Sequence, residues 1–448
     1  MQQNLLFQDS VGYSSKWYIF KTTELGKIYD SIPWEALSCC LPKQKKDRPG
    51  AVNWFSNAGM FGVMFLKHYT NLSDEKLLDR INTDWAMQLF CGILLADNEQ
   101  IKDRAIVSRI RGRISKQADL LDEVQKKLID HWQQHMEDTE ELHIDASCYE
   151  SYIRYPTDVK LLWECCEWVF EKQLFVYCKQ LGIKRPRSKY TEQAIKQLNY
   201  ARKKKRTYKH ALVRRRSLLH LLTKGIGQLK HTLSGSVQLQ LQPNIGYYIT
   251  LATVEKILEQ QQYLFDNPQG RVEGRIVSLH KPYIRPIKRG KENKSVEFGM
   301  KLHKVQVDGV NQIDLMSFNN FNESTRLQTC VEVHKNQYGI CDRLGADQIY
   351  ATNANRSFLT PEKIITCFPK KGTDNSTKEE KEIRSAIGKT RATRLEGSFG
   401  NEKNHYGLRK VKAQSEGTEK VWVFFGIMTA NAVLISKREP PGQRQQAA

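Results

Sequence analysis

A carboxylate, a glycine and a lysine lie at helical spacing from one another within the segment 391–409. If this segment is a helix, Glu396, Gly400 and Lys403 lie on one face of it. The carboxylate can then hold a divalent cation, the glycine lets another surface approach, and the lysine can meet a phosphate as a point charge. An exposed helix of mixed charge has the same pattern, so this segment alone does not decide between the two interpretations.

Two further acids follow short apolar stretches that have the length of core strands. Asp145 ends the stretch Glu141–Asp145, and Asp347 follows the small residues Gly345 and Ala346. Either acid alone is compatible with an ordinary residue of a strand-end turn. Carboxylates from separate elements meet only if the fold joins those elements. We therefore expect a mixed sheet in which the two strands are neighbours, with the helix of Glu396 packed on one face.

Three carboxylates at one place point to metal chemistry. Like charges held close together raise one another's pKa unless a cation lies between them. Two Mg²⁺ ions about 3.5–4 Å apart would neutralise the cluster and hold the attacking and leaving oxygens of a phosphodiester during in-line displacement. The chemistry that these residue types support is metal-dependent phosphoryl transfer.

Composition favours a nucleic-acid partner. The chain has 70 Lys and Arg against 49 Asp and Glu, which gives a formal charge of +21. An excess of this size favours a polyanion, and nucleic acid is the commonest one. No apolar run approaches the roughly 18–20 residues that a membrane span needs, and the best one, Ala58–Leu66, has half that length. We expect neither a membrane partner nor a signal peptide. The ten cysteines show no C-x-x-C spacing and are expected to be buried, reduced thiols of a cytosolic protein.

Hydrophobic periodicity suggests a division of the chain. The expected parts are an irregular segment at 1–48, a helical DNA-binding domain at 49–138, a catalytic domain at 139–437 and a disordered tail at 438–448. In the second part, Ser73 is a plausible helix cap and Lys102–Lys116 carries a basic face. These features fit a helix-turn-helix-like module, and a plain helical domain explains them as well.

The catalytic part is itself interrupted. A largely helical basic insertion is expected at about 160–268, after which strand-like alternation begins at Arg275 and continues through Val296–Val307. Asp308-Gly309 is expected to be a hairpin turn. A loop or mobile linker is expected from Pro369 to about Arg384.

Basic residues concentrate in the insertion and in the loop after it. Nine Lys and Arg occur between 202 and 216 with no acid among them. A solvated charge run is the usual explanation, but neighbouring like charges repel without a counterion, and phosphate contacts would supply one. The residues expected to contact DNA are Arg202, Lys203, Lys204, Lys205, Arg206, Arg214, Arg215, Arg216, Arg285, Lys288, Arg289, Lys291, Arg391, Arg394 and Lys403.

Several motifs together resemble the DDE transposases of bacterial insertion sequences. The motifs are Ile144-Asp145-Ala146 with Ile153–Asp158, Ala346–Tyr350 with Asn355-Arg356, and Arg394–Gly400 with Lys403 and Tyr406–Leu408. In addition, Val277–His280, Arg285–Lys291 and Val296–Gly299 are similar to the stretch before the second Asp in one large subgroup. The resemblance covers roughly residues 45–435. Its motifs are specific jointly, although each is weak alone.

The resemblance implies an α/β RNase H-like fold, in which a mixed sheet is flanked by helices and accompanied by the helical N-terminal domain and the helical insertion. Asp145, Asp347 and Glu396 would be the ligands of two Mg²⁺ ions, with Mn²⁺ as an alternative, and Lys403 would match the family's lysine seven residues after the glutamate. The arginine that many related enzymes carry four residues before the glutamate is Ala392 here. Arg391 and Arg394 flank that position, and the sequence leaves open which of them serves.

The implied activity is cleavage and joining of DNA. Water would attack a phosphodiester at the end of the element, and the freed 3′-OH would attack target DNA. A homodimer would hold two double-stranded DNA ends, and the protein would act in the bacterial cytoplasm, at the nucleoid. Two related functions compete with this one, an RNase H-like DNA nuclease without joining activity and a non-catalytic DNA-binding relic. A basic RNA-binding scaffold is a further alternative, but the chain lacks the aromatic-rich strand motif that stacks bases.

Overall fold

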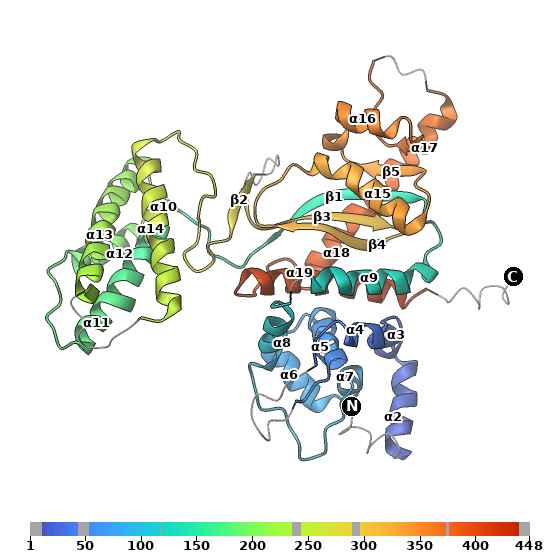
Figure 1. The fold of residues 1–448 in the computed structure, drawn as a ribbon, viewed down its shortest axis with the longest axis horizontal. Helices are drawn as coiled ribbons and strands as arrows, with labels where there is room; N and C mark the ends of the chain where they lie inside the picture. The colour runs from blue at the N-terminus through green and yellow to red at the C-terminus, as the bar shows by residue number, and fades with distance from the viewer. Residues whose placement is uncertain are drawn as a thin grey trace. The chain divides into compact units, whose positions relative to one another are not determined.

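The computed structural model describes residues 11–43, 53–117, 119–234, 243–288, 296–372 and 376–438. Contacts within the chain divide it into two compact units. Unit 1 comprises the described residues of Met1–Tyr152, Met300–Ser317 and Phe321–Ala448, and unit 2 those of Ile153–Gly299 and Phe318–Asn320. Helices dominate both units, and a mixed sheet accompanies them (Figure 1). The predicted α/β class, with a helical N-terminal region and a helical insertion, is confirmed.

The sheet has strands of both directions. Its strands are β1 (Glu141–Glu150), β2 (Arg285–Lys288), β3 (Val296–Val307), β4 (Val310–Ser317), β5 (Arg343–Ala346) and β6 (Ile365–Thr366). Their order is β2-β3-β1-β5-β6, and β4 also pairs with β3. β5 is parallel to both β1 and β6, whereas β3 is antiparallel to β2 and β4. Asp308 and Gly309 join β3 to β4 with φ of 46° and 80°, so the predicted hairpin turn is confirmed.

The N-terminal part of unit 1 is helical from its first described residues. Its elements are α2 (Val11–Thr22), α3 (Glu24–Asp30), α4 (Trp34–Ser38), α5 (Asn57–Thr70), α6 (Asp74–Thr83), α7 (Trp85–Phe90), α8 (Ile106–Ile114), α9 (Leu120–Trp132) and η1 (Gln133–His135). The expectation of an irregular segment at 1–48 is therefore wrong for α2, α3 and α4. Aromatic packing stabilises these short helices, with Tyr29 against Trp17, Phe20 and Trp34. Helices of five and seven residues carry too little periodicity to be seen in the sequence.

Helix α19 (Glu416–Ile435) lies between the sheet and the N-terminal helices (Figure 1). Phe425 packs on Phe61 and Phe65 of α5, and Asn431 exchanges hydrogen bonds of 2.9 and 2.7 Å with the backbone of Asn311 in β4. The two regions therefore share one core and form no separate domains at residue 138. By length and composition α19 could cross a membrane, contrary to the expectation that no apolar run is long enough. However, 83% of its apolar window is buried inside the protein.

The remaining helical elements of unit 1 follow β4. They are η4 (Glu323–Arg326), α15 (Leu327–Tyr338), η5 (Gln348–Tyr350), α16 (Asn353–Leu359), α17 (Lys378–Thr390), η6 (Arg391–Glu396) and α18 (Gly397–His405). The expected linker is shorter than predicted, because a capping box of Thr377 and Glu380 starts α17. Arg438, assigned to a disordered tail, donates hydrogen bonds of 2.9 Å to Asp308 and to the His135 carbonyl. Residues 439–448 lie outside the described part of the chain.

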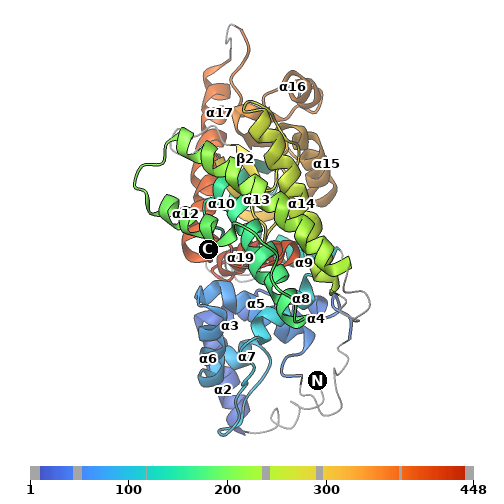
Figure 2. The ribbon, with the colours of Figure 1, turned by 90° about the vertical axis from the view of Figure 1, so that its left-hand side faces the viewer.

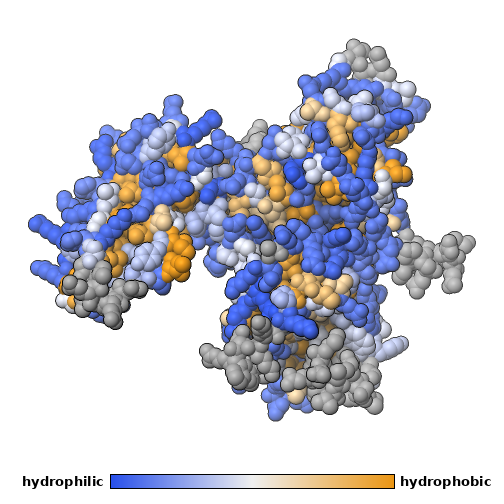
Figure 3. All heavy atoms as spheres, in the orientation of Figure 1, coloured by the Kyte–Doolittle hydropathy of each residue, from blue (hydrophilic) through white to orange (hydrophobic). Residues whose placement is uncertain are grey.

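Unit 2 is a helical bundle. Its helices are α10 (Asp158–Glu167), η2 (Trp168–Leu174), α11 (Phe175–Gln180), α12 (Tyr190–Arg202), α13 (Tyr208–Ser234) and α14 (Ile245–Asp266), and α13 and α14 run side by side in Figure 2. The strand expected at 275–279 is absent from this described segment. The backbone N–H of Ile276 instead donates to Gln260 of α14 at 2.9 Å, and Ile276 and Leu279 pack into the helical core. Hydrophilic side chains cover most of the unit's visible face, with small apolar areas between them (Figure 3).

Candidate active site

The register of β1 and β5 brings Asp145 and Asp347 together. Ile144 is paired with Ala346 in this parallel ladder. Asp145 directly follows Ile144 and Asp347 directly follows Ala346, so the two acids lie on neighbouring strands at the same level. Asp347 follows the end of β5, as predicted. Asp145 lies in the middle of β1 instead of near its end, because β1 continues along its other neighbour, the twelve-residue β3.

Arg391 connects the third acid to this pair. Its Nη2 lies 2.9 Å from Oε1 of Glu396, and its Nη1 lies 3.6 Å from Oδ2 of Asp145. Arg391 and Glu396 are the first and last residues of η6, a π-helical turn. A π-helical turn aligns residues five apart, which explains why these two side chains face each other. The structure thus brings the three predicted acids to one region and identifies Arg391, not Arg394, as the arginine there.

The electrostatic environment of Asp145 is unfavourable for a lone carboxylate. Burial raises its pKa above the ordinary value, and the negative charges of Glu323 and Asp347 raise it further. The backbone N–H of Ala146 and the guanidinium of Arg391 oppose this rise. A cation close to Asp145 would therefore be stabilised by the surrounding acids.

Glu323 is a fourth acid of this region, and sequence reasoning missed it. It begins η4, and its Oε2 lies 3.0 Å from Nζ of Lys301 in β3, with both side chains mostly buried. Its charge also affects the hydroxyl of Tyr350, three residues after Asp347. In the sequence, an acid at the start of a helix looks like an ordinary first-turn residue, so no signal marked it.

Lys403 reaches the same face of the sheet from α18. Its Nζ donates to Oγ of Ser147 at 2.9 Å and lies 5.2 Å from the centre of the Tyr149 ring. Ser147 lies two residues after Asp145, and alternate residues of a strand share a face. The predicted spacing of Glu396 and Lys403 therefore does direct both residues towards Asp145. Gly400 faces open space among the described residues.

A buried ion pair fixes α18 to β3. Nζ of Lys304 lies 2.8 Å from Oε1 of Glu402, and both side chains are fully buried. The Asn311 amide donates to the same oxygen at 3.2 Å, and the Tyr149 hydroxyl donates to Oε2. Lys304 also lies 3.8 Å from the ring centre of Phe399. This network holds in place the helix that carries Lys403.

A second buried network lies behind η5. Nδ1 of His303 is 2.9 Å from Asp314, and its Nε2 is 2.8 Å from the Tyr350 hydroxyl. Arg326 donates two hydrogen bonds to Asp314, at 2.7 and 2.8 Å. With Cys330, His303 and Asp314 are close enough to share a metal ion. Because Asp314 and His303 already have protein partners, we interpret this cluster as structural support for the residues after Asp347.

The basic residues of the insertion fall into two groups. Arg202, Lys203, Lys204, Lys205, Arg206 and Arg216 are exposed. Arg214 and Arg215 are buried, contrary to the expectation that they contact DNA. Arg214 donates to Gln193 at 2.7 Å and to Gln197 at 3.2 Å, while Arg215 lies 3.6 Å from Asp158. Both arginines lie on the face of α13 that packs into the bundle.

The later basic residues also differ in their surroundings. Arg285 in β2 is half-buried and donates to the carbonyl of Ile284 at 3.1 Å, whereas Lys288 is exposed. Arg394 is 57% exposed and lies 3.4 Å from Asp308. Arg289 and Lys291 lie outside the described residues.

The three acids have the donor chemistry of the implied metal, but their carboxylates do not lie close enough to one another to share one ion. Among the described residues only His303, Asp314 and Cys330 do so. Asp145, Asp347 and Glu396 offer only hard oxygen donors, which are the ligands that Mg²⁺ and Mn²⁺ accept. Burial raises the pKa of Asp145, the charges of Glu323 and Asp347 raise it further, and a nearby cation would oppose this rise. The ten cysteines are all free thiols.

Comparison with known proteins identifies one region of the chain. Residues 17–113, which reach from α2 into α8, match the family model of a transposase domain (DUF772). This match supports a transposase. No curated protein and no solved structure matches the chain.

Proposed function

We propose that the protein is a transposase that binds the ends of a mobile DNA element, cuts them and joins them to target DNA with the help of divalent metal ions. One observation carries this proposal. The pairing of Ile144 with Ala346 places Asp145 beside Asp347, and Arg391 links Asp145 to Glu396. The transposase-domain match at residues 17–113 supports the same class of protein.

Each residue has a role in this proposal. Asp145, Asp347 and Glu396 bind two Mg²⁺ or Mn²⁺ ions, which when bound activate water and stabilise charge on the phosphodiester. Lys403, held at Ser147 two residues from Asp145, binds a phosphate oxygen beside the cut. Arg391 orients Asp145 and Glu396 and offers a second cation to the DNA. The RNase H-like assignment of the core belongs to the same proposal and is supported by the mixed sheet.

The proposal extends to partners and place. Double-stranded DNA is the substrate, and a homodimer would hold two element ends together. The exposed lysines and arginines at 202–206 suit contacts with the phosphate backbone. A transposase acts where DNA is, and we place the protein in the bacterial cytoplasm, at the nucleoid.

A second candidate is a DNA-binding relic that no longer cuts. Arg391 favours it, because its guanidinium already supplies a counterion to Asp145 and Glu396. In a relic this arginine would act as a permanent substitute for metal. A nuclease without joining activity is the other alternative, and it would use the same acids.

One experiment separates the three functions. Purified protein is incubated with the DNA that flanks its own gene, a supercoiled target plasmid and Mg²⁺ or Mn²⁺, and the products are sequenced. Nicks at flanking inverted repeats together with joined products are expected. Nicks without joining would indicate the nuclease, and binding without nicks would indicate the relic.

A further inference from the structure

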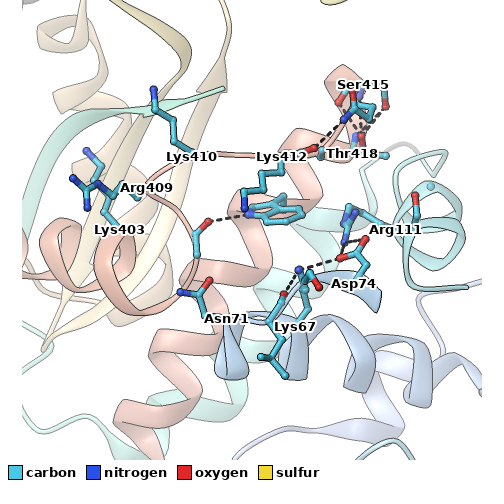
Figure 4. Close-up of a pocket in the computed structure, with 18 of the residues that line it drawn as sticks. Lys67, Asn71, Asp74, Arg111, Lys403, Arg409, Lys410, Lys412, Ser415 and Thr418 are labelled. Carbon is cyan, nitrogen blue, oxygen red and sulfur yellow. Dashed lines mark hydrogen bonds and ion pairs between the residues drawn. The ribbon is translucent and has the colours of Figure 1, made fainter. Parts of the chain in front are cut away.

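A basic cleft of about 720 Å³ lies within unit 1 (Figure 4). It is formed by α5, α6 and α8, by the end of α18, and by the segment that leads into α19. Six of its lining residues are basic and one is acidic, namely Lys67, Arg111, Lys403, Arg409, Lys410, Lys412 and Asp74. Serine, threonine, asparagine and glutamine side chains supply further hydrogen-bonding groups. Such a lining suits an anion with several oxygens.

The single acid does not neutralise the cleft. Asp74 lies 3.0 Å from Lys67 and 2.9 Å from Arg111, so one carboxylate balances two buried cations. Nε of Arg111 is buried and has no hydrogen-bond partner among the described residues, and the side chain as a whole is 4% exposed. Burial lowers the pKa of Lys67, Asp74 opposes this shift, and the charges of Arg111 and Lys412 add to it. Because Asp74 is shared by two basic side chains and the buried Nε of Arg111 has no partner among the described residues, the inner wall can accept an anion.

The outer wall adds exposed cations. Arg409 and Lys412 are exposed, and neither forms an ion pair with an acid in the described part of the chain. Lys410 is paired with Glu150. Figure 4 shows Lys403, Arg409 and Lys410 towards one side of the cleft, Arg111 and Asp74 towards the other, and Lys412 between them.

The cleft adjoins the candidate active site through Lys403. This residue lines the cleft and donates to Ser147, two residues from Asp145. A chain of phosphates that enters the cleft can therefore continue towards the acids. Trp422 at the base is covered by Lys67, 4.8 Å from its ring centre, and by Arg111 at 4.6 Å. The Trp422 side chain is only 6% exposed and so cannot stack on a base, which favours backbone phosphates over bases as the ligand.

We propose that this cleft binds the phosphodiester backbone of duplex DNA next to the phosphate that is cut. The region that matches the transposase domain and the helix that carries Lys403 would then both contact the same DNA strand. This inference rests on the proposed function for the identity of the ligand and assigns to it a second site. Arg409 and Lys412 make the exposed contacts, and Arg111 completes them inside.

The test measures DNA binding and leaves cleavage aside. The variant Arg409→Ala/Lys412→Ala and the wild type are titrated with a fluorescent duplex from the flanking DNA. The titrations are made without divalent metal at KCl concentrations from about 50 to about 300 mM. The matched control is Lys27→Ala/Lys126→Ala, which removes two exposed lysines of unit 1 that do not line the cleft. All four positions are exposed, and thermal unfolding verifies that each variant is folded.

We expect the cleft variant to bind DNA roughly tenfold more weakly at about 150 mM salt. The salt slope, which is the slope of log K for DNA binding against log salt concentration, should fall in magnitude by about one for each lost phosphate contact. The conservative variant Arg409→Lys/Lys412→Arg should retain the wild-type slope. An unchanged slope, or an equal loss in the control, would overturn the inference. Equal weakening towards a polyglutamate peptide would also overturn it, because the cleft would then recognise acidic polymers in general.

The test of the cleft and the test of the proposed function can fail separately. If the wild type cuts no DNA, the salt slopes still test the cleft. If the cleft variant binds like wild type, metal-dependent cleavage by the wild type remains measurable in the separate assay.

Discussion

Arg391 Nη2 lies 2.9 Å from Glu396 Oε1, while Nη1 of the same guanidinium lies 3.6 Å from Asp145. Neither Ala392 nor Arg394 makes both of these contacts. Ala392 has no charge, and Arg394 points to Asp308, 3.4 Å away. The π-helical turn η6 thus displaces the arginine by one residue from the position that the resemblance implied, and it keeps the arginine at the acids.

Replacing Arg391 by Gln should destabilise the metal-free protein, because the half-buried carboxylate of Asp145 loses its nearest cation. We expect a cost of about 1–3 kcal/mol in the free energy of unfolding. Added Mn²⁺ should restore more stability to this variant than to the wild type. Urea denaturation with EDTA or Mn²⁺ measures both effects. Arg394→Gln is the control and should change little, since Arg394 is largely exposed. An equal response of the two variants would contradict the bridging role.

The stability of the metal-free protein should depend on the ionisation of Asp145. Its pKa is raised in the folded state, chiefly by burial, so ionisation costs more in the folded than in the unfolded chain. This penalty is absent below the unfolded pKa of about 3.9 and is present in full above the folded value. Asp145→Asn should therefore raise the unfolding midpoint at pH 7 and lose that advantage as the pH falls to about 4. Thermal unfolding in EDTA at pH 7 and at about pH 4 measures this difference in midpoint. Asp342→Asn is the control, because Asp342 is exposed. A lower midpoint at pH 7 would show that the contact with Arg391 outweighs burial.

The pair of Lys304 and Glu402 should behave as a unit. Both side chains are fully buried, so Lys304→Met alone or Glu402→Gln alone leaves an unbalanced charge and should cost about 3–5 kcal/mol. The double variant should recover a large part of that loss. Urea unfolding of the four proteins gives the coupling energy. Additive effects of the two substitutions would contradict this account of how α18 is held.

Burial separates two groups of basic residues in unit 2. Lys203→Gln/Lys204→Gln/Lys205→Gln should weaken DNA binding and flatten its salt dependence, by about one in the slope for each phosphate contact. Arg214→Gln should instead lower the thermal stability of the protein, because Arg214 is buried against Gln193 and Gln197. Fluorescence anisotropy and thermal unfolding of both variants check the contrast. A stable Arg214→Gln protein with the larger loss of DNA affinity would reverse the assignment.

Much of the site could be predicted because its acids follow apolar strands. The stretches before Asp145 and Asp347 have strand length, and a parallel pair places the residues after them together. The spacing of Glu396 and Lys403 also indicated a helical face. Ser73 was recognised as a helix cap, and its hydroxyl accepts from the Lys76 N–H at 3.2 Å.

Other features depend on contacts between distant segments, which a single sequence does not display. The sequence left open whether Arg391 or Arg394 lies at the acids, because a π-helical turn leaves no simple periodic signal. Glu323 is adjacent to the acids only through its tertiary position. Arg214 and Arg215 look like the neighbouring surface charges, and only the packing of α13 separates them. The merging of the N-terminal helices with the sheet likewise results from α19, more than 300 residues further on in the chain from α5.

The central claim is that Asp145, Asp347 and Glu396 together carry metal-dependent DNA chemistry. The most direct measurement compares cleavage of the flanking DNA by the wild type with Asp145→Asn, Asp347→Asn and Glu396→Gln, with and without Mg²⁺ or Mn²⁺, while DNA affinity is measured in parallel. We expect the wild type to cleave DNA only when metal is present, and all three variants to bind DNA with wild-type affinity without cleaving it. Full cleavage by the three variants would contradict it.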